Sequence, residues 1–358
     1  MKNIGLRDRI RGSLIGGAAG DALGYAVEFS SEYGIFSMYG KPGITEYDRD
    51  EASGLALFSD DTQMTLFTAA GLLRAETQGM PYQSGIDLAY RDWLITQGEA
   101  PRRADERWPL TEKQLFARRA PGHTCITAMR QRMGHEPETD YIGSRLNSSK
   151  GCGGIMRIAP VALINNALPL RERDMLAAQA AAITHSHPLG YMCCAPAAHV
   201  IRRILTDSDS MTLKEMVLEA RDALPELFPE NGYVDTLTEL IDRAVALSEN
   251  DESDLDNIHK LGEGWVGEEA MAIALYCVLR HPDDFDACLI AAVNHRGDSD
   301  STGAIAGNIV GAMVGYDAIA EKWKTHLELR QLLLDTADDL YTARPETPDA
   351  IWNQKYAK

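Results

Sequence analysis

The sequence lacks the features that mark a membrane or secreted protein. It has no run of about 18 apolar residues, so no membrane-spanning helix is expected. The N-terminal stretch Met1 to Arg11 includes five charged residues and no apolar segment of the kind found in signal peptides. We therefore expect a soluble protein of the cytoplasm.

Paired cysteines are also missing. The six cysteines form no C-x-x-C pair and no zinc-ligand spacing, and the adjacent Cys193 and Cys194 are poor disulfide candidates. We expect free thiols in a reducing compartment and no zinc site.

Basic residues are scarce. The chain has 35 Lys and Arg against 53 Asp and Glu, which gives a formal net charge of −18. Such a chain repels phosphate backbones, so neither nucleic acid nor an anionic membrane is an expected partner. An anionic ligand would need locally placed cations or backbone amides.

Sustained alternation of apolar and polar residues is scarce too, and no Pro/Ser linker divides the chain. Instead, apolar residues recur at three- and four-residue steps, which predicts an all-α fold. With 358 residues and 45% hydrophobic content, we expect one compact multi-helix domain over residues 1–358. The segments with this periodicity are Thr62–Glu76, Glu172–Thr184, Leu213–Leu224, Val234–Leu247, Glu268–Leu279 and Thr302–Val314.

Three segments are predicted to be irregular because they are rich in Gly, Ser or Tyr: Ser30–Phe58, Gly98–Arg107 and Arg145–Gly154. The acidic run Glu249–Asp256 is expected to link two surface helices and to be solvated.

Glycine recurs every four residues near both ends of the chain, at Gly12, Gly16, Gly20 and Gly24, and at Gly303, Gly307, Gly311 and Gly315. Each interior glycine costs a helix about 1 kcal/mol relative to alanine, so a compensating contact is required. Close approach of two helix backbones is such a contact. We therefore expect the two glycine-lined helices to pack near each other, which would bring the two ends of the chain together.

Two short clusters of acidic and hydroxyl residues are the most informative feature. The first is Ser59-Asp60-Asp61-Thr62, and the second is Asp298-Ser299-Asp300-Ser301. Either alone is typical of a helix start, with a capping side chain and first-turn carboxylates. Together they offer the oxygen ligands that select Mg²⁺, Mn²⁺ or Ca²⁺ over zinc. The spacing of an EF-hand loop is absent.

Six ordered motifs carry a resemblance that extends over roughly residues 5–316. They are Gly20-Asp21-Ala22-Leu23-Gly24 with Glu28, Ser59 to Met64, Gly151 to Arg157, Thr184 to Pro188, Gly264 to Ala270, and Gly297 to Gly303. In this order they resemble the ADP-ribosylglycohydrolase family, which includes the dinitrogenase reductase-activating glycohydrolase. The resemblance implies a compact all-α fold, two Mg²⁺ or Mn²⁺ ions, and removal of ADP-ribose from modified targets.

The resemblance also assigns roles to residues of this chain. The implied metal ligands are Ser59, Asp60, Asp61, Asp298, Asp300 and Ser301, with Ser at two positions where Thr is frequent in the family. The implied catalytic residues are Glu28, on a segment over the ribose, together with Asp60, Asp61 and Asp300. The implied substrate-binding residues are Gly122, Thr124, Ser149, Lys150, Gly151, Cys152, Gly153 and His185.

The sequence around Gly151 can also be interpreted without the family resemblance. Several neighbouring glycines let backbone amides approach a pyrophosphate closely, although an isolated glycine-rich loop is also typical of a plain turn. Cys152 stands where some family members have Asn, which leaves backbone amides as the donors. His187 is expected to be structural, and Trp265 is a candidate for the border of the cleft.

The expected function is hydrolysis of the glycosidic bond between ADP-ribose and a protein side chain. The most favoured linkage, by resemblance, is to arginine, and serine-linked substrates stay open. The expected partners are an ADP-ribosylated protein, the product ADP-ribose, and, as a further candidate, a cognate ADP-ribosyltransferase. Two alternatives remain. One is a binding protein that occludes an ADP-ribosyltransferase, and the other is a metal-dependent glycosidase acting on small ADP-ribosyl or nucleoside metabolites.

Overall fold

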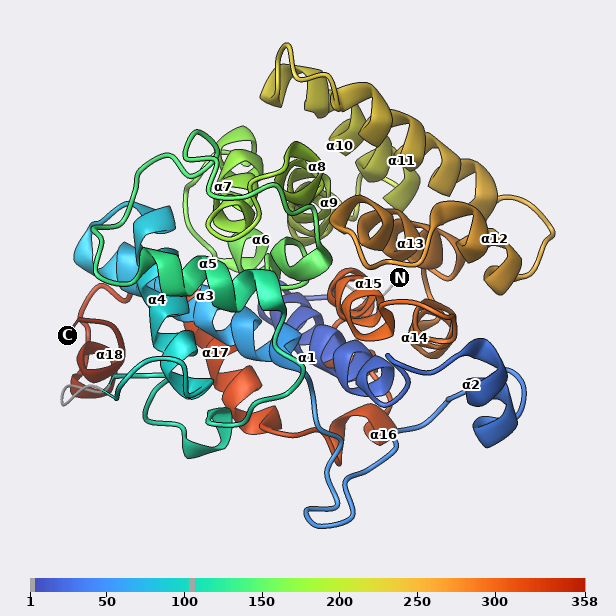
Figure 1. Ribbon diagram of the computed structural model, residues 1–358, viewed down its shortest axis with the longest axis horizontal. Helices are drawn as coiled ribbons and strands as arrows, with labels where there is room; N and C mark the ends of the chain where they lie inside the picture. The colour runs from blue at the N-terminus through green and yellow to red at the C-terminus, as the bar shows by residue number, and fades with distance from the viewer. Residues whose placement is uncertain (1–3, 103–106, 358) are drawn as a thin grey trace.

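The computed structural model describes residues 4–102 and 107–357, and helices joined by loops make up these parts of the chain (Figure 1). Their only β-type pairings are two isolated bridges, Ala56 with Leu327 and Gly151 with Val266. The all-α prediction is confirmed. None of the helices in these ranges combines the length and the apolar character needed to cross a bilayer.

The helices of the first half are α1 (Leu6–Tyr25), α2 (Glu32–Tyr39), α3 (Asp60–Gln78), α4 (Tyr82–Thr96), α5 (His123–Arg132), α6 (Ala159–Leu163) and α7 (Leu170–Ala182). Those of the second half are α8 (Pro188–Met192), α9 (Cys194–Asp207), α10 (Leu213–Leu227), α11 (Val234–Ser248), α12 (Asp254–Leu261), α13 (Gly267–Arg280), α14 (Phe285–Val293), α15 (Ser299–Val314), α16 (Glu321–Lys324), α17 (Arg330–Thr342) and α18 (Ala350–Trp352). Short 3-10 turns span Lys113–Leu115, Cys152–Gly154 and Tyr316–Ala318, and a π turn spans Asn353–Ala357.

The helices predicted from apolar periodicity are confirmed, as α3, α7, α10, α11, α13 and α15. One irregular segment was predicted wrongly, because Ser30–Phe58 contains α2. Ser31 caps this helix, its side chain accepting a hydrogen bond from the Gly34 amide, and Gly40 ends it at a positive φ of 75°. The segment Arg145–Gly154 is irregular except for its closing 3-10 turn. Part of Gly98–Arg107 lies outside the described residues.

The glycine-lined helices α1 and α15 pack against each other near the centre of the molecule (Figure 1). They run antiparallel, because Gly12 meets Gly311 whereas Gly24 meets Ser299. A methyl group added at Gly16 would lie 2.2 Å from the carbonyl oxygen of Gly307, and one at Gly20 would lie 1.9 Å from that of Gly303. No side chain fits in so little space. The predicted pairing of the two stripes is confirmed, and it places the C-terminal end of α1 beside the N-terminal end of α15.

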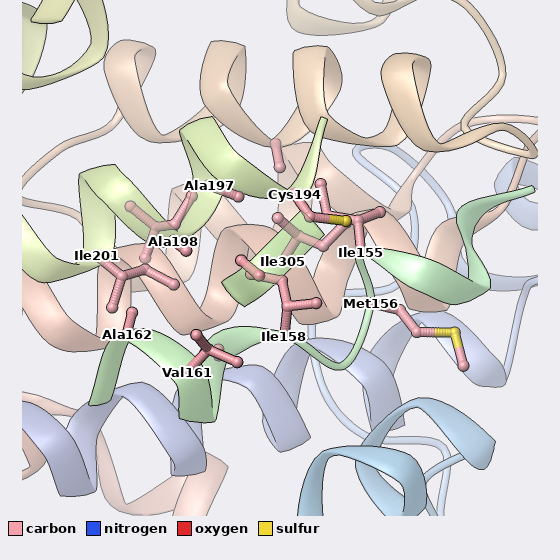
Figure 2. Packing of buried hydrophobic residues seen from close by; sticks show 14 of the residues in the cluster. Ile155, Met156, Ile158, Val161, Ala162, Cys194, Ala197, Ala198, Ile201 and Ile305 are labelled. Carbon is pink, nitrogen blue, oxygen red and sulfur yellow. The ribbon is translucent and has the colours of Figure 1, made fainter. Parts of the chain in front are cut away.

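The hydrophobic core continues behind this pair. In Figure 2, Ile155 and Cys194 lie close to Ile305 of α15, and Ala198 and Ile201 line the facing side of α9. All five side chains are buried. The chain between the glycine loop and α6 is thereby fixed against two long helices, so the loop that precedes it has a rigid base.

Candidate metal centre and ligand cavity

Both acidic clusters begin helices. Ser59 caps α3, its Oγ accepting a hydrogen bond of 3.2 Å from the Asp61 amide. Asp298 caps α15 in the same way, with its Oδ1 3.3 Å from the Ser301 amide. The positive ends of two helix dipoles therefore meet the carboxylates of the following turns, which favours their ionised form.

Asp21 of α1 fixes the start of α3. Its Oδ1 accepts a hydrogen bond of 2.8 Å from the Ser59 amide, and its Oδ2 accepts bonds from the amide and the hydroxyl of Thr62, at 2.9 Å and 2.6 Å. Asp21 was not among the predicted site residues. Because α1 packs on α15 along the glycine stripe, Asp21 ties the first acidic cluster to the helix that carries the second.

The two clusters face a single cavity of about 200 Å³. Its acidic and hydroxyl lining comes from Glu28, Asp60, Asp61, Asp298, Asp300 and Ser301. Further lining comes from Ala120, Gly122, His123, Thr124, Cys125, Gly151, Cys152, Gly153, Met156, His185 and Trp265. Residues separated by more than two hundred positions thus meet at one place, as the glycine stripes predicted.

Three of the carboxylates lie close enough to one another to share a cation. One oxygen each of Glu28, Asp298 and Asp300 lies within 4.8 Å of the other two, and all three side chains are buried. Asp61 Oδ2 and Glu28 Oε2 are both buried, and neither has a hydrogen-bond partner among the described residues. Unpaired carboxylate oxygens in a buried site fit hard divalent cations, which would supply positive charge and be coordinated by those oxygens.

Burial dominates the electrostatics of these acids. It raises the pKa of Glu28 to about 10, with further contributions from the charges of Asp300 and Asp298. The pKa values of Asp60, Asp61 and Asp298 are raised well above the usual range for the same first reason, burial. Burial, followed by the charge of Asp300, raises the pKa of Asp21 to about 7. The protein alone cannot ionise all of these groups at neutral pH without a compensating positive charge.

Three predicted site residues, Ser59, Ser149 and Lys150, do not line this cavity, and Ser149 lines an adjoining groove instead. Ser59 is fully buried and its hydroxyl caps the helix, whereas the next two residues, Asp60 and Asp61, line the cavity. The Lys150 ammonium forms an ion pair with Glu268. The prediction that Lys150 binds substrate gains no support from the position of its side chain.

Three backbone amides of the glycine-rich loop donate to partners within the protein. The Ser149 amide donates to Asn147 Oδ1, the Gly151 amide to Ser149 Oγ, and the Cys152 amide to the Trp265 carbonyl. These donors are already used within the protein. The Cys152 side chain, in contrast, does form a hydrogen bond, because its Sγ lies 2.5 Å from Asp298 Oδ2. The thiol therefore orients a carboxylate of the second cluster.

A polar groove adjoins the acidic cavity. It has a volume of about 300 Å³ and is lined by His123, Thr124, Thr127, Ala128, Gln131, Asn147, Ser148 and Ser149. His123 and Thr124 line both spaces, and Thr124 Oγ1 lies 3.1 Å from Ser149 Oγ. The predicted residues Thr124 and Ser149 therefore lie where the two spaces join, which suits a ligand extending away from the acidic end.

An aromatic pair forms the rim. Trp265 lines the cavity with 40% of its surface exposed, and Phe29, next to Glu28, is 75% exposed. Their rings stack with centroids 6.3 Å apart and an interplanar angle of 21°. The expectation that Trp265 borders the cleft is confirmed. Phe29 was missed because a single exposed ring carries no sequence signal.

His187 caps α8, accepting a hydrogen bond from the Leu189 amide, in keeping with its predicted structural role.

Comparisons with known proteins agree with this architecture. A family model described as ADP-ribosylglycohydrolase matches residues 2–350. The chain is 26% identical over 340 residues to the ADP-ribosyl-dinitrogen reductase glycohydrolase of Rhodospirillum rubrum, covering 92% of this chain and 94% of that protein. It is 25% identical to ADP-ribosylhydrolase ARH3 of Homo sapiens, with 89% of each covered.

Two further comparisons concern linkage and fold. The chain is 24% identical to ADP-ribosylarginine hydrolase Tri1 of Pseudomonas putida, over 96% of this chain and 80% of that protein. A solved structure titled ADP-ribosylglycohydrolase-related protein complex superposes with a TM-score of 0.64 at 24% identity, covering 94% of this chain and 98% of that one. This last similarity shows a shared fold.

Proposed function

The chain belongs to the ADP-ribosylglycohydrolase family, and from this premise we propose that it removes ADP-ribose from modified arginine side chains of proteins, using two divalent cations. Hydrolytic removal of ADP-ribose is the activity that the family and its named members indicate. The arginine linkage and the pair of cations are the finer parts of the proposal. One observation carries it: two distant acidic clusters and Glu28 meet in one buried cavity.

The cavity offers two groups of ligands for cations. Asp60 and Asp61 stand at the start of α3, and Asp298, Asp300 and Ser301 at the start of α15, with Glu28 beside the second group. Mg²⁺ or Mn²⁺ suits such an all-oxygen donor set. Cations bound there supply Lewis-acid polarisation of the ribose hydroxyls and of the attacking water.

The remaining residues position the substrate. Glu28 covers the terminal ribose, and Thr124 and His185 contact the rest of the ADP-ribosyl group where the cavity meets the polar groove. Water attacks the anomeric carbon, the carbon–nitrogen bond to the guanidinium breaks, and free ADP-ribose and unmodified arginine are the products. Holding water and sugar in one buried site removes much of the entropic barrier.

Released ADP-ribose from defined substrates tests the proposal. Proteins or peptides carrying arginine-linked, serine-linked or nucleic-acid-linked ADP-ribose are incubated with the purified protein and Mg²⁺ or Mn²⁺, and the product is identified by mass spectrometry. We expect turnover of the arginine-linked substrate and its arrest by a chelator. Release from the serine-linked substrate alone would contradict the arginine assignment, and undiminished release under chelation would contradict the role of the cations.

The same experiment separates the enzyme from an occluding protein. Trace amounts of the wild-type chain should remove many equivalents of ADP-ribose. If only stoichiometric amounts have an effect, and Asp60→Ala is equally effective, the chain acts by occlusion of a transferase.

A further inference from the structure

Arg157 is a fully buried arginine that contacts Cys125 of the cavity lining, and no ion pair joins it to a carboxylate of the described residues. Its guanidinium lies over the Tyr90 ring, 4.2 Å from the ring centre, and one nitrogen lies near two sulfur atoms, 3.1 Å from Met64 Sδ and 3.4 Å from Cys125 Sγ. Burying a guanidinium charge without a carboxylate partner costs free energy, so its one remaining hydrogen bond is expected to have a purpose.

That remaining contact is to Thr184. Arg157 donates from its second terminal nitrogen to Thr184 Oγ1 at 2.5 Å. Arginine has donors and no acceptor, so the threonine oxygen must accept here and keeps its own proton for another partner. Two acceptors are within reach, His185 Nδ1 at 2.8 Å and the Ala181 carbonyl at 3.4 Å.

Geometry selects the histidine. Hydroxyl hydrogen bonds are normally about 2.5–3.0 Å long, which the contact to His185 Nδ1 satisfies and the contact to Ala181 does not. His185 is neutral at physiological pH, because burial, and then the charge of Arg157, lower its pKa to about 3. A neutral imidazole has one donor and one acceptor nitrogen. With Nδ1 accepting, the single ring proton resides on Nε2.

Nε2 faces the ligand space. His185 lines the cavity, and a methyl group added at Gly151 or at Gly153 would lie 3.3 Å from Nε2, so the glycine loop leaves this nitrogen accessible. No described protein group forms a hydrogen bond with it. We infer that Arg157 and Thr184 are positioning residues that hold His185 as its Nε2–H tautomer, ready to donate to an oxygen of the ADP-ribosyl ligand. This inference rests on the proposed function for the identity of the ligand only.

The tautomer is measurable in the free protein. Nitrogen-15 NMR of histidine side chains distinguishes a protonated from an unprotonated ring nitrogen, and a His185→Gln variant assigns the signals by their disappearance. We expect wild-type His185 to carry its proton on Nε2 and to remain neutral throughout pH 6 to 8. A proton on Nδ1 in the wild-type protein would overturn the inference. Because this measurement needs neither substrate nor activity, it stands apart from the test of the proposed function.

Variants of Thr184 then test whether its hydroxyl fixes the tautomer of His185. Thr184→Ser keeps the hydroxyl and should keep both the tautomer and the affinity for ADP-ribose. Thr184→Val keeps the shape of the side chain but lacks the hydroxyl, so His185 should no longer favour the Nε2–H tautomer. ADP-ribose binding should weaken by about tenfold, the loss expected for one hydrogen bond to a charged ligand. If Thr184→Val kept both the His185 tautomer and the affinity for ADP-ribose, Thr184 would not be a positioning residue. If Thr184→Val does not fold, the wild-type tautomer decides.

Discussion

At the scale of single residues, the site depends on carboxylates kept in a buried environment that raises their pKa values. Glu28 is the clearest case, because it combines a raised pKa, an unpartnered oxygen and a position beside two aspartates. Such perturbed groups concentrate at functional sites. Asp21 is different, since its hydrogen bonds to the start of α3 give it a supporting role.

Glu28→Gln separates function from stability. The amide keeps the size of the side chain but cannot take up or release a proton, so we expect hydrolysis to fall about 100-fold or more. Because the raised pKa means that Glu28 must take up a proton when the metal-free protein folds, the substitution should at the same time raise the thermal stability of that form. Initial rates and melting temperatures measure the two effects. Glu226→Gln, in an exposed ion pair with Arg171, is the matched control and should change neither. If the Glu28→Gln protein hydrolysed the substrate at the wild-type rate, Glu28 would have no catalytic role.

Sequence reasoning could predict Asp60, Asp61, Asp298 and Asp300 because adjacent carboxylates and helix starts leave a local pattern. It could not predict that the Ser59 side chain would stay out of the cavity lining, that Lys150 would pair with Glu268, or that loop amides would be used internally. These outcomes depend on contacts between distant segments, which spacing along the chain does not reveal.

At the scale of helices, the packing of α1 on α15 determines where the two acidic clusters meet. Periodicity of glycine and of apolar residues predicted this arrangement, because one helical face repeats every three to four residues. The same reasoning missed α2, whose eight residues are too short to show a clear period and lie in a segment rich in Gly and Tyr.

Adding one methyl group tests the helix contact. Gly16→Ala would place a carbon 2.2 Å from the Gly307 carbonyl oxygen, so we expect a loss of about 2 kcal/mol or more in the free energy of unfolding, together with loss of activity. Gly34→Ala, on α2, meets only Ser31 Oγ at 3.4 Å and should stabilise by up to about 1 kcal/mol through helix propensity. Chemical denaturation measures both. A Gly16→Ala protein as stable as wild type would contradict the close contact.

The segment bearing Glu28 is tested through its neighbour. Phe29→Ala removes the ring stacked on Trp265, a contact of the kind that contributes about 0.5–1.5 kcal/mol. Because Phe29 is mostly exposed, we expect unchanged overall stability but weaker ADP-ribose binding and slower turnover, with Phe29→Tyr close to wild type. Calorimetric binding and steady-state rates measure this. Wild-type binding and turnover in Phe29→Ala would show that the stack does not position Glu28.

At the scale of the whole molecule, the buried acids couple stability to pH and to cations. Their pKa values are raised in the folded state, to about 10 for Glu28 and about 7 for Asp21, so the stability they contribute is complete below pH 4 and is lost as pH rises through those values. His185, whose folded pKa is lowered to about 3, contributes stability above pH 6.5 that is lost only as pH falls. Between pH 7 and 8.5 the acids therefore dominate.

We expect the metal-free protein to lose thermal stability between pH 7 and 8.5. Each group that is ionised only when unfolded contributes about 1.4 kcal/mol per pH unit. The proposed binding of Mg²⁺ requires ionised carboxylates, so the rise in melting temperature on adding Mg²⁺ should grow over the same interval. Calorimetry with and without chelator measures this. A metal-free protein that becomes more stable with rising pH would contradict the electrostatic account.

The stoichiometry of Mn²⁺ binding tests the central claim most directly, that the two distant acidic clusters form one centre for two cations. Titration of the metal-free protein with Mn²⁺, followed by calorimetry and electron paramagnetic resonance, should give two ions per chain with magnetic coupling between them. Asp61→Asn and Asp298→Asn should each lose at least one ion and the coupling. Two uncoupled ions, or full binding in both variants, would contradict the account.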